Sequence, residues 1–246
     1  MFIRGTMHSI KNKFQCLAAA LLMTAFLTAL GCGDSAPPEP PRSEKAVESF
    51  TFFDLGVNTR LSKEIIQNLD DRLGSHSLEE RGIIDFSIQP TGALKNYFSA
   101  LHRLNRQLNS PVGERIEHDI RRYMYRYAAR RGMPFNFIEL VFSGRSGLPL
   151  YFRIASIKGE TGFLDTFHQK YGPPVVIKWP RVETEFLSWA KAGDRLIVSV
   201  GTDRYGAPEY HITIVFTRNL DRLLALEKSG RKKMQGKEVD SGNTAF

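Results

Sequence analysis

Apolar and polar side chains alternate with a period of two through much of the chain between Phe135 and Phe216. Because successive side chains of a strand point to opposite faces, this alternation predicts strands with one buried face. Apart from a helical stretch at 161–172, the connections are too short for crossovers, so antiparallel neighbours are expected. The predicted strands are two within 135–156, separated by a Gly-rich turn, and one each at 175–179, 184–191, 194–201 and 209–216. The second half of the chain therefore predicts an antiparallel sheet.

The first half of the chain carries mainly helical periodicity. Apolar residues three and four apart predict a helix over 59–74, with Gly74 as its end. A longer repeat runs from Leu94 to Leu108, breaks near Pro111, and resumes from Ile116 until Gly132, which predicts a long helical hairpin. Short strands are expected at 48–53 and at 82–89, the second with Ile84, Phe86 and Ile88 facing inward.

The N-terminal stretch from Cys16 to Leu30 contains no charged residue and follows Arg4, Lys11 and Lys13. About 15 helical residues rising about 1.5 Å each span roughly 22 Å, which is less than the ~30 Å hydrocarbon core of a membrane. A basic segment followed by a short apolar one is typical of an export signal. We therefore expect export and cleavage rather than a permanent membrane span.

The apolar run ends in Ala29-Leu30-Gly31-Cys32, which resembles the lipobox of bacterial lipoprotein precursors, with Ala29 where these usually have leucine. The resemblance implies a diacylglycerol thioether on Cys32, cleavage after Gly31 by signal peptidase II, and acylation of the new amino group with a fatty acid such as palmitate. Several acyl chains are needed because one chain alone anchors a protein weakly. Gly33 rather than aspartate follows the cysteine, which favours the outer over the inner membrane. The alternative is an uncleaved signal anchor in which Cys32 has no role.

These features divide the chain into four parts. Residues 1–31 form the expected signal peptide, and residues 32–47 form a lipid-anchored tether, because four prolines between positions 37 and 41 favour an extended chain. Residues 48–229 form the expected α+β domain, an antiparallel sheet with a long helical hairpin and a C-terminal helix from Thr217 to Gly230. Residues 230–246 are polar and basic and are expected to be disordered.

Composition excludes several kinds of chemistry in the mature chain. The full chain has two cysteines, Cys16 and Cys32. Cys16 would be removed with the signal peptide and the Cys32 thiol would carry the lipid, so the mature chain would have no free thiol for a disulfide, a metal or a nucleophile. The histidines after residue 31 show no metal-ligand spacing, and no metal or cofactor is expected. Removing residues 1–31 takes away three basic and no acidic residues, so the net charge falls from +8 to +5. This charge suits the membrane, anionic lipid, a cell-wall polymer or an envelope protein as partner, and nucleic acid is not expected there.

Three arrangements invite a catalytic interpretation. Ser146 lies in a Ser-Gly-Arg-Ser-Gly stretch, but its glycines are not placed as in a nucleophile elbow, so a hairpin turn is expected. Asp165 and His168 lie three apart on a predicted helix, where the carboxylate could orient the imidazole, although an exposed pair is the commoner arrangement. A carboxylate pair for glycoside cleavage stays open among Glu183, Glu185 and Glu209, near strand ends. No catalytic residue is assigned.

A stripe of arginines marks the predicted helix over 114–131. At about 100° per residue, Arg115, Arg122, Arg126 and Arg130 share one face, opposite the apolar stripe. Because arginine binds phosphate and carboxylate groups bidentately, the stripe predicts a docking surface for anions. The alternative is a solvated face on which Asp119 pairs with Arg115 or Arg122.

The sequence therefore predicts a lipoprotein of the bacterial envelope, anchored by lipid and facing the periplasm. We expect a non-enzymatic binding or structural module that meets another envelope component. The alternative is an envelope hydrolase whose active site has no recognisable motif. A deep cleft with buried polar side chains would favour the hydrolase, and a flat apolar or basic face would favour the binding module.

Overall fold

The computed structural model of the chain describes residues 49–157, 162–179, 185–202, 205–206 and 208–243. The chain divides into two compact units, residues 1–42 and 43–246, and every described residue belongs to the second. The predicted signal peptide and tether, including Gly31 and Cys32, lie outside the described residues.

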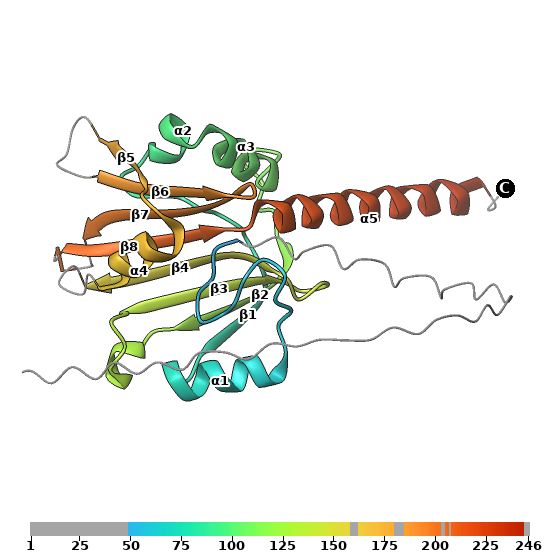
Figure 1. Ribbon diagram of the computed structural model, residues 1–246. Coiled ribbons are helices and arrows are strands. Elements are labelled where there is room, and N and C mark those ends of the chain that lie inside the picture. Colours follow the sequence, from blue (N-terminus) through green and yellow to red (C-terminus); the bar gives the residue numbers. More distant parts are fainter. Residues whose placement is uncertain (1–48, 158–161, 180–184, 203–204, 207, 244–246) are drawn as a thin grey trace, which may run out of the picture. The chain divides into compact units, whose positions relative to one another are not determined.

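Eight antiparallel strands form one sheet in the described part of the second unit, in the order β1-β2-β3-β4-β8-β7-β6-β5 (Figure 1). The last strand, β8, lies between β4 and β7 and joins two groups of consecutive strands into one sheet. The strands are β1 Ser77–Gly82, β2 His118–Tyr125, β3 Phe137–Ser143, β4 Pro149–Ile157, β5 Val175–Lys178, β6 Glu185–Lys191, β7 Asp194–Thr202 and β8 Pro208–Val215. The predicted α+β class and antiparallel sheet are confirmed.

Helices accompany the sheet on both sides. They are α1 Lys63–Leu73, α2 Ala93–Tyr97, α3 Ser99–Leu108, a 3₁₀ turn at Ala128–Arg131, α4 Gly162–Tyr171 and α5 Thr217–Asn243. The predicted α1 begins where the Ser62 hydroxyl accepts a hydrogen bond from the Ile65 amide at 3.3 Å, and it ends at Gly74 with φ 88°. Within the described ranges, none of these helices has the length and hydropathy that crossing a membrane requires.

The sheet is the middle of three layers, because two separate apolar clusters cover its two faces. Ile138 and Leu140 of β3 belong to the first cluster and Val141 to the second, as a period of two requires. The segment 50–57, α1 and α4 pack on the first face, and the segment 84–88, α2, α3 and the start of α5 pack on the second. Within the described chain, the buried apolar side chains of both clusters come from residues 50–224.

The second half of the predicted helical hairpin is wrong. Leu94 to Leu108 forms α2 and α3 as expected, but the segment that follows is strand β2 and a 3₁₀ turn. In β2, Ile120 packs in the second cluster while Tyr123 and Tyr125 pack in the first. Because both faces of this strand are covered, its apolar residues do not alternate with polar ones, and their spacing resembles that of a helix.

The shorter elements also differ from expectation. Described residues of the predicted strand at 48–53 contribute only an isolated bridge, from Phe52 to Leu55. Ile84, Phe86 and Ile88 are buried as predicted, but residues 83–88 pair with no strand. The edge strand is instead β1, whose polar sequence gave no strand pattern. Helix α5 continues past Gly230, where an end was predicted, to Asn243.

Candidate functional site

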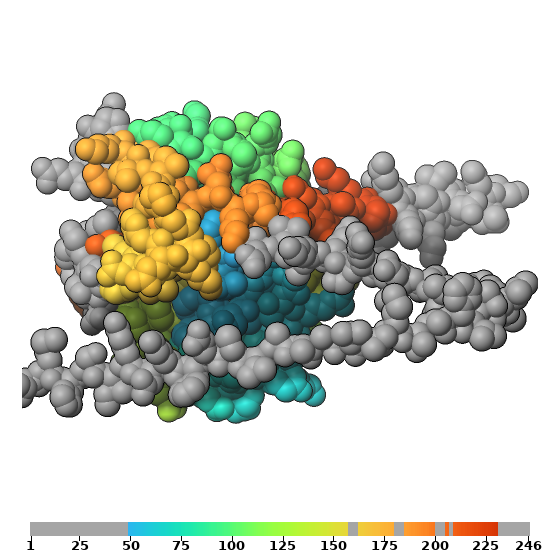
Figure 2. All heavy atoms as spheres, in the orientation of Figure 1, coloured from blue at the N-terminus to red at the C-terminus, as the bar shows by residue number. Residues whose placement is uncertain are grey.

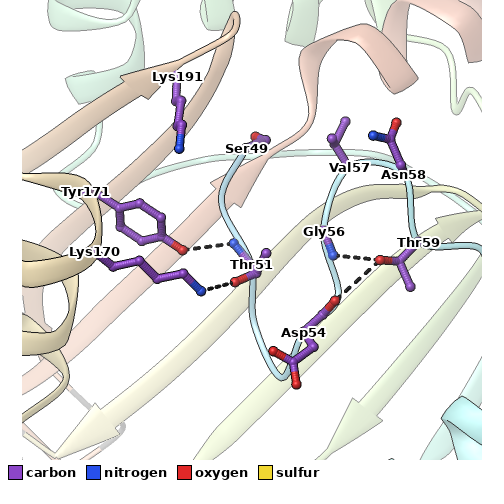
Figure 3. A pocket seen from close by; sticks show the side chains of 10 residues that line it. All are labelled: Ser49, Thr51, Asp54, Gly56, Val57, Asn58, Thr59, Lys170, Tyr171 and Lys191. Carbon is purple, nitrogen blue, oxygen red and sulfur yellow. Dashed lines mark hydrogen bonds between the residues drawn. The ribbon is translucent and has the colours of Figure 1, made fainter. Parts of the chain in front are cut away.

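A hollow of about 390 Å³ opens beside the first described residues of the chain. It lies between the segment 49–59, the C-terminal end of α4 and the end of β6, and we call it the N-terminal pocket (Figure 3). Figure 2 shows the blue surface of this segment between the gold surface of α4 and the orange surface of neighbouring strands. The pocket is lined by Ser49, Thr51, Asp54, Gly56, Val57, Asn58, Thr59, Lys170, Tyr171 and Lys191.

A tight turn shapes one wall of this pocket. The backbone N–H groups of Phe52 and Leu55 donate to each other's carbonyl oxygens at 3.1 and 2.9 Å. The two residues between them, Phe53 and Asp54, have φ angles of 47° and 64°, in the left-handed region that glycine usually occupies. The guanidinium of Arg72 lies 4.1 Å from the centre of the Phe53 ring and holds it. The turn is therefore a strained conformation fixed by its surroundings.

The end of α4 clamps the strand that enters this turn. The Thr51 amide donates a hydrogen bond to the Tyr171 hydroxyl at 3.0 Å, and Lys170 Nζ donates to Thr51 Oγ1 at 2.6 Å. The Tyr171 ring also meets Phe50 edge-on, with centroids 4.9 Å apart. Trp189 of β6 donates from Nε1 to the Gly172 carbonyl at 2.8 Å and fixes the end of α4. These contacts hold two polar side chains of α4 against the pocket.

A buried carboxylate secures the base of the pocket. Ser49 donates from its hydroxyl to Asp194, which is fully buried at the start of β7. Asp194 also accepts a hydrogen bond from the Thr217 amide at 2.9 Å, so this carboxylate caps α5. Burial raises the pKa of Asp194, and the bonds from Ser49 and Thr217 oppose that rise. The Thr217 hydroxyl lies 2.9 Å from the Gly193 carbonyl oxygen and 3.3 Å from Asp194 Oδ1.

The pocket lining carries more positive than negative charge. Among the described residues that line the pocket, two are lysines, Lys170 and Lys191, and one is acidic, Asp54; the remaining polar groups are hydroxyls, an amide and backbone. Such a lining can hold an anionic group by charge and by N–H and O–H donors. The sequence interpretation missed these residues, because Ser49, Lys170 and Lys191 come from three distant segments. The turn between Phe52 and Leu55 has no glycine at the two positions with positive φ. This indicates strain, but only after the structure has shown that these residues form a turn.

A second, smaller hollow of about 250 Å³ lies where the same turn meets α1. It shares Asp54 and Thr59 with the N-terminal pocket, and Ile65, Leu69 and Arg72 form the α1 side. The strained turn thus stands between two hollows.

The predicted arginine stripe does not exist, because the segment 114–131 is not one helix. Arg122 lies on β2 with 13% of its side chain exposed, and it contacts Glu79 and Glu139. The other three lie outside β2, each with its own neighbour. Arg115 pairs with Glu117 at 2.9 Å, Arg126 lies 5.5 Å from the Phe137 ring centre, and Arg130 lies 4.5 Å from the Tyr127 ring centre. The basis for the predicted anion-docking surface is therefore wrong.

In place of that stripe, a charge network lies on the second face of the sheet. Glu139 is buried on β3, and its carboxylate lies 2.9 Å from Arg122 Nε and 3.1 Å from Arg153 Nη1. The Tyr151 hydroxyl donates to Glu139 at 3.0 Å, and Arg153 donates to the Asp85 carbonyl at 2.8 Å. The network joins β2, β3 and β4 to the segment 84–88, which packs on the same face of the sheet, and this indicates a structural role.

The other predicted candidates do not come together. Ser146 lies in the turn between β3 and β4, as expected, with its amide donating to Ser143 Oγ at 3.2 Å. His168 packs on Trp189 at 5.9 Å between ring centroids, and the structure gives it no hydrogen bond to Asp165.

The strand register separates the candidate carboxylates. Phe186, Ser199 and His211 are opposite one another across β6, β7 and β8 and share a face. Glu209 is two residues from His211 and lies on that face, whereas Glu185 precedes Phe186 and lies on the other. They therefore cannot act as one catalytic pair, and Glu183 lies outside the described residues.

Three other histidines do lie beside carboxylates. The closest atoms are 2.6 Å apart for His76 and Asp70, 2.9 Å for His118 and Glu227, and 3.6 Å for His211 and Glu209. Among the described residues, no group of three histidine, cysteine or acidic side chains gathers as a metal site.

Comparison with family models, with curated proteins and with solved structures finds no match to this chain.

Proposed function

We propose that the protein is a lipid-anchored module of the bacterial envelope that binds another envelope component, with the N-terminal pocket as its recognition site. The observation that carries this proposal is the place of the pocket in the chain. Ser49, which lines the pocket, follows directly on the Pro-rich segment that begins at Cys32. An extended chain of that length reaches about 50 Å at about 3.1 Å per residue. A lipid on Cys32 would keep the pocket within that distance of the membrane.

The lipid anchor is tested by the Cys32→Ala variant. Acyl labelling and cleavage after Gly31 should both be lost, because the thiol is the proposed lipid acceptor. Wild-type protein should fractionate with the outer membrane, as Gly33 favours. Normal maturation of the variant would disprove the anchor, and fractionation with inner-membrane markers would disprove the choice of membrane.

The binding role is tested by crosslinking the wild-type lipoprotein in its native envelope. A defined partner should be captured, and Lys170→Gln with Lys191→Gln should reduce the yield without reducing the amount of lipoprotein. Substitution of Lys63, an exposed residue of α1 outside the pocket, is the matched control. Equal capture by all variants would exclude the pocket as the recognition site.

A hydrolytic role is the second candidate, and the Asp70–His76 pair is the observation that favours it. Asp70 Oδ1 lies 2.6 Å from His76 Nδ1 and can orient the imidazole as a general base. The side chain of His76 is 22% exposed, so water can reach it. Hydrolysis of isolated envelope material by the wild type and its loss in His76→Gln would favour this role over binding alone.

A further inference from the structure

The second hollow, between the strained turn and α1, combines an apolar base with a few polar groups. We call it the α1 hollow, and it is lined by Phe53, Asp54, Leu55, Thr59, Ile65, Asn68, Leu69 and Arg72. Leu55 and Leu69 are buried members of the first apolar cluster, and Phe53 and Ile65 pack against that cluster. The volume of about 250 Å³ is below the roughly 300 Å³ at which sites for drug-sized ligands begin. A ligand of this hollow is therefore small and partly apolar.

Side chains of both charges line the α1 hollow. Arg72 comes from the last turn of α1, and Asn68 lies four residues before it on the same face of that helix. Asp54 comes from the turn, and Figure 3 shows its side chain at the tip. Within the described part of the chain, the Arg72 guanidinium contacts the Phe53 ring, and neither Arg72 nor Asp54 forms an ion pair. A positive and a negative group thus border one apolar hollow without contacting each other.

The turn that carries Asp54 is fixed from both sides. Thr59 Oγ1 accepts a hydrogen bond from the Gly56 amide at 3.0 Å and donates to the Asp54 carbonyl at 3.4 Å. On the other side, the Arg72 guanidinium lies 4.1 Å from the centre of the Phe53 ring. Strained backbone of this kind gathers at ligand-binding sites, where the surrounding structure holds it in advance. Less conformational freedom is then lost when a ligand binds.

We infer that the α1 hollow binds a small apolar α-amino acid, with its carboxylate on Arg72 and its ammonium group on Asp54. Arginine binds a carboxylate bidentately, and a carboxylate accepts charge-assisted hydrogen bonds from an ammonium group. A simple acid would meet the charge of Asp54, and a simple amine would meet that of Arg72, whereas a zwitterion satisfies both. The apolar side chain would lie on Ile65 and Leu69. This site is separate from the proposed recognition site and uses no lysine of the N-terminal pocket.

The test is calorimetric titration of the full chain in a neutral detergent at neutral pH. Leucine is the main probe, 4-methylpentanoate has the same skeleton without the amine, and 3-methylbutylamine has it without the carboxylate. Wild type should bind leucine at least about tenfold more tightly than either analogue. Each analogue loses one charge-assisted contact and leaves one charge of the hollow without a partner.

Two substitutions separate the two charges. Asp54→Asn should leave the turn intact, because asparagine is among the residues that adopt positive φ most readily. It should weaken leucine binding about tenfold and strengthen 4-methylpentanoate binding, since the repulsion from the carboxylate is removed. Arg72→Gln should weaken the binding of both, and Arg72→Lys, which keeps the charge, should bind leucine more tightly than Arg72→Gln. Arg103→Gln, at an exposed arginine of α3 outside the hollow, is the matched control and should bind as wild type does.

Each outcome decides the inference. Absence of leucine binding to wild type, or binding of 4-methylpentanoate as tight as that of leucine, would overturn it. Equal leucine affinity of wild type, Asp54→Asn and Arg72→Gln at unchanged melting temperatures would also overturn it. If Arg72→Gln melts early, the opposite effects of Asp54→Asn on the two probes still decide the matter. Partner capture by the N-terminal pocket is read without these probes, so failure here leaves the proposed function intact.

Discussion

The hydroxyl of Ser49 donates a hydrogen bond to the buried carboxylate of Asp194, 145 residues further along the chain. The same carboxylate accepts the amide hydrogen of Thr217 at the start of α5. One side chain thus joins the first described residue of the domain, the β6–β7 turn and the C-terminal helix. Because Ser49 lines the N-terminal pocket, the Asp194 carboxylate holds one residue of the pocket lining in place.

Replacing Asp194 with alanine should destabilise the domain by roughly 2–4 kcal/mol, because it removes a helix cap and leaves buried donors of Ser49 and Thr217 without an acceptor. Asp194→Asn keeps an acceptor oxygen at the same place and should retain most of the stability at neutral pH. Urea unfolding of both variants gives the free energies. Equal losses in the two variants would show that hydrogen bonding by this side chain is unimportant.

The pH dependence of Asp194 follows from its raised pKa, whose main cause is burial. A carboxyl group with a higher pKa in the folded than in the unfolded state, where 3.8 is the ordinary value, favours folding most when it is protonated. Its contribution is therefore full below about pH 4 and is lost as the pH rises through the folded-state pKa. The stability of wild type relative to Asp194→Asn should fall between pH 4 and pH 7. A difference that stays constant over this range would contradict the raised pKa.

The buried network around Glu139 predicts a large difference between two carboxylates. Glu139→Gln removes the buried negative charge between Arg122 and Arg153 and should cost about 3 kcal/mol, because two partly buried positive charges lose the carboxylate that they share. Glu79→Gln breaks a contact of the same arginine, but Glu79 is 39% exposed, so its loss should cost less than about 1 kcal/mol. Denaturant unfolding at neutral pH compares them, and similar losses would mean that burial does not set the strength of this network.

Whether a strand of this fold can be recognised from the sequence depends on whether its apolar and polar side chains alternate. The alternation of Ile138 and Leu140 with Glu139 identifies β3, and a short turn joins it to β4. Strand β2 carries buried side chains on both faces, so its pattern does not distinguish it from a helix. Once β2 was assigned to a helix, the contact of Arg122 with Glu139 could not be foreseen.

The candidate site was harder to predict than the fold. Ser49, Lys170 and Lys191 meet only because α4 and the β6–β7 turn pack beside the segment 49–59, and no local pattern encodes that meeting. Asp194 begins β7, as the predicted strand at 194–201 does, but its role as the cap of α5 depends on the position of β8 between β4 and β7.

His211 gives a second pH test with the opposite sign. Burial lowers the pKa of this imidazole and Arg153 lowers it further, while the nearby Glu209 carboxylate opposes them. The folded state therefore binds fewer protons than the unfolded state, whose ordinary value is 6.5. The stability that His211 contributes is present above about pH 6.5 and is lost as the pH falls through the lowered folded-state pKa.

The stability of wild type relative to His211→Asn should accordingly decrease between pH 7.5 and pH 5, as measured by urea unfolding. Glu209→Gln removes the nearby negative charge that favours the imidazolium, so in that variant the His211 pKa should fall further and the loss of stability should be larger. Proton NMR titration of the His211 ring in both proteins measures the two pKa values directly. A His211 pKa at or above 6.5 in the folded wild type, or a rise in this pKa on Glu209→Gln, would show that burial does not dominate at this position.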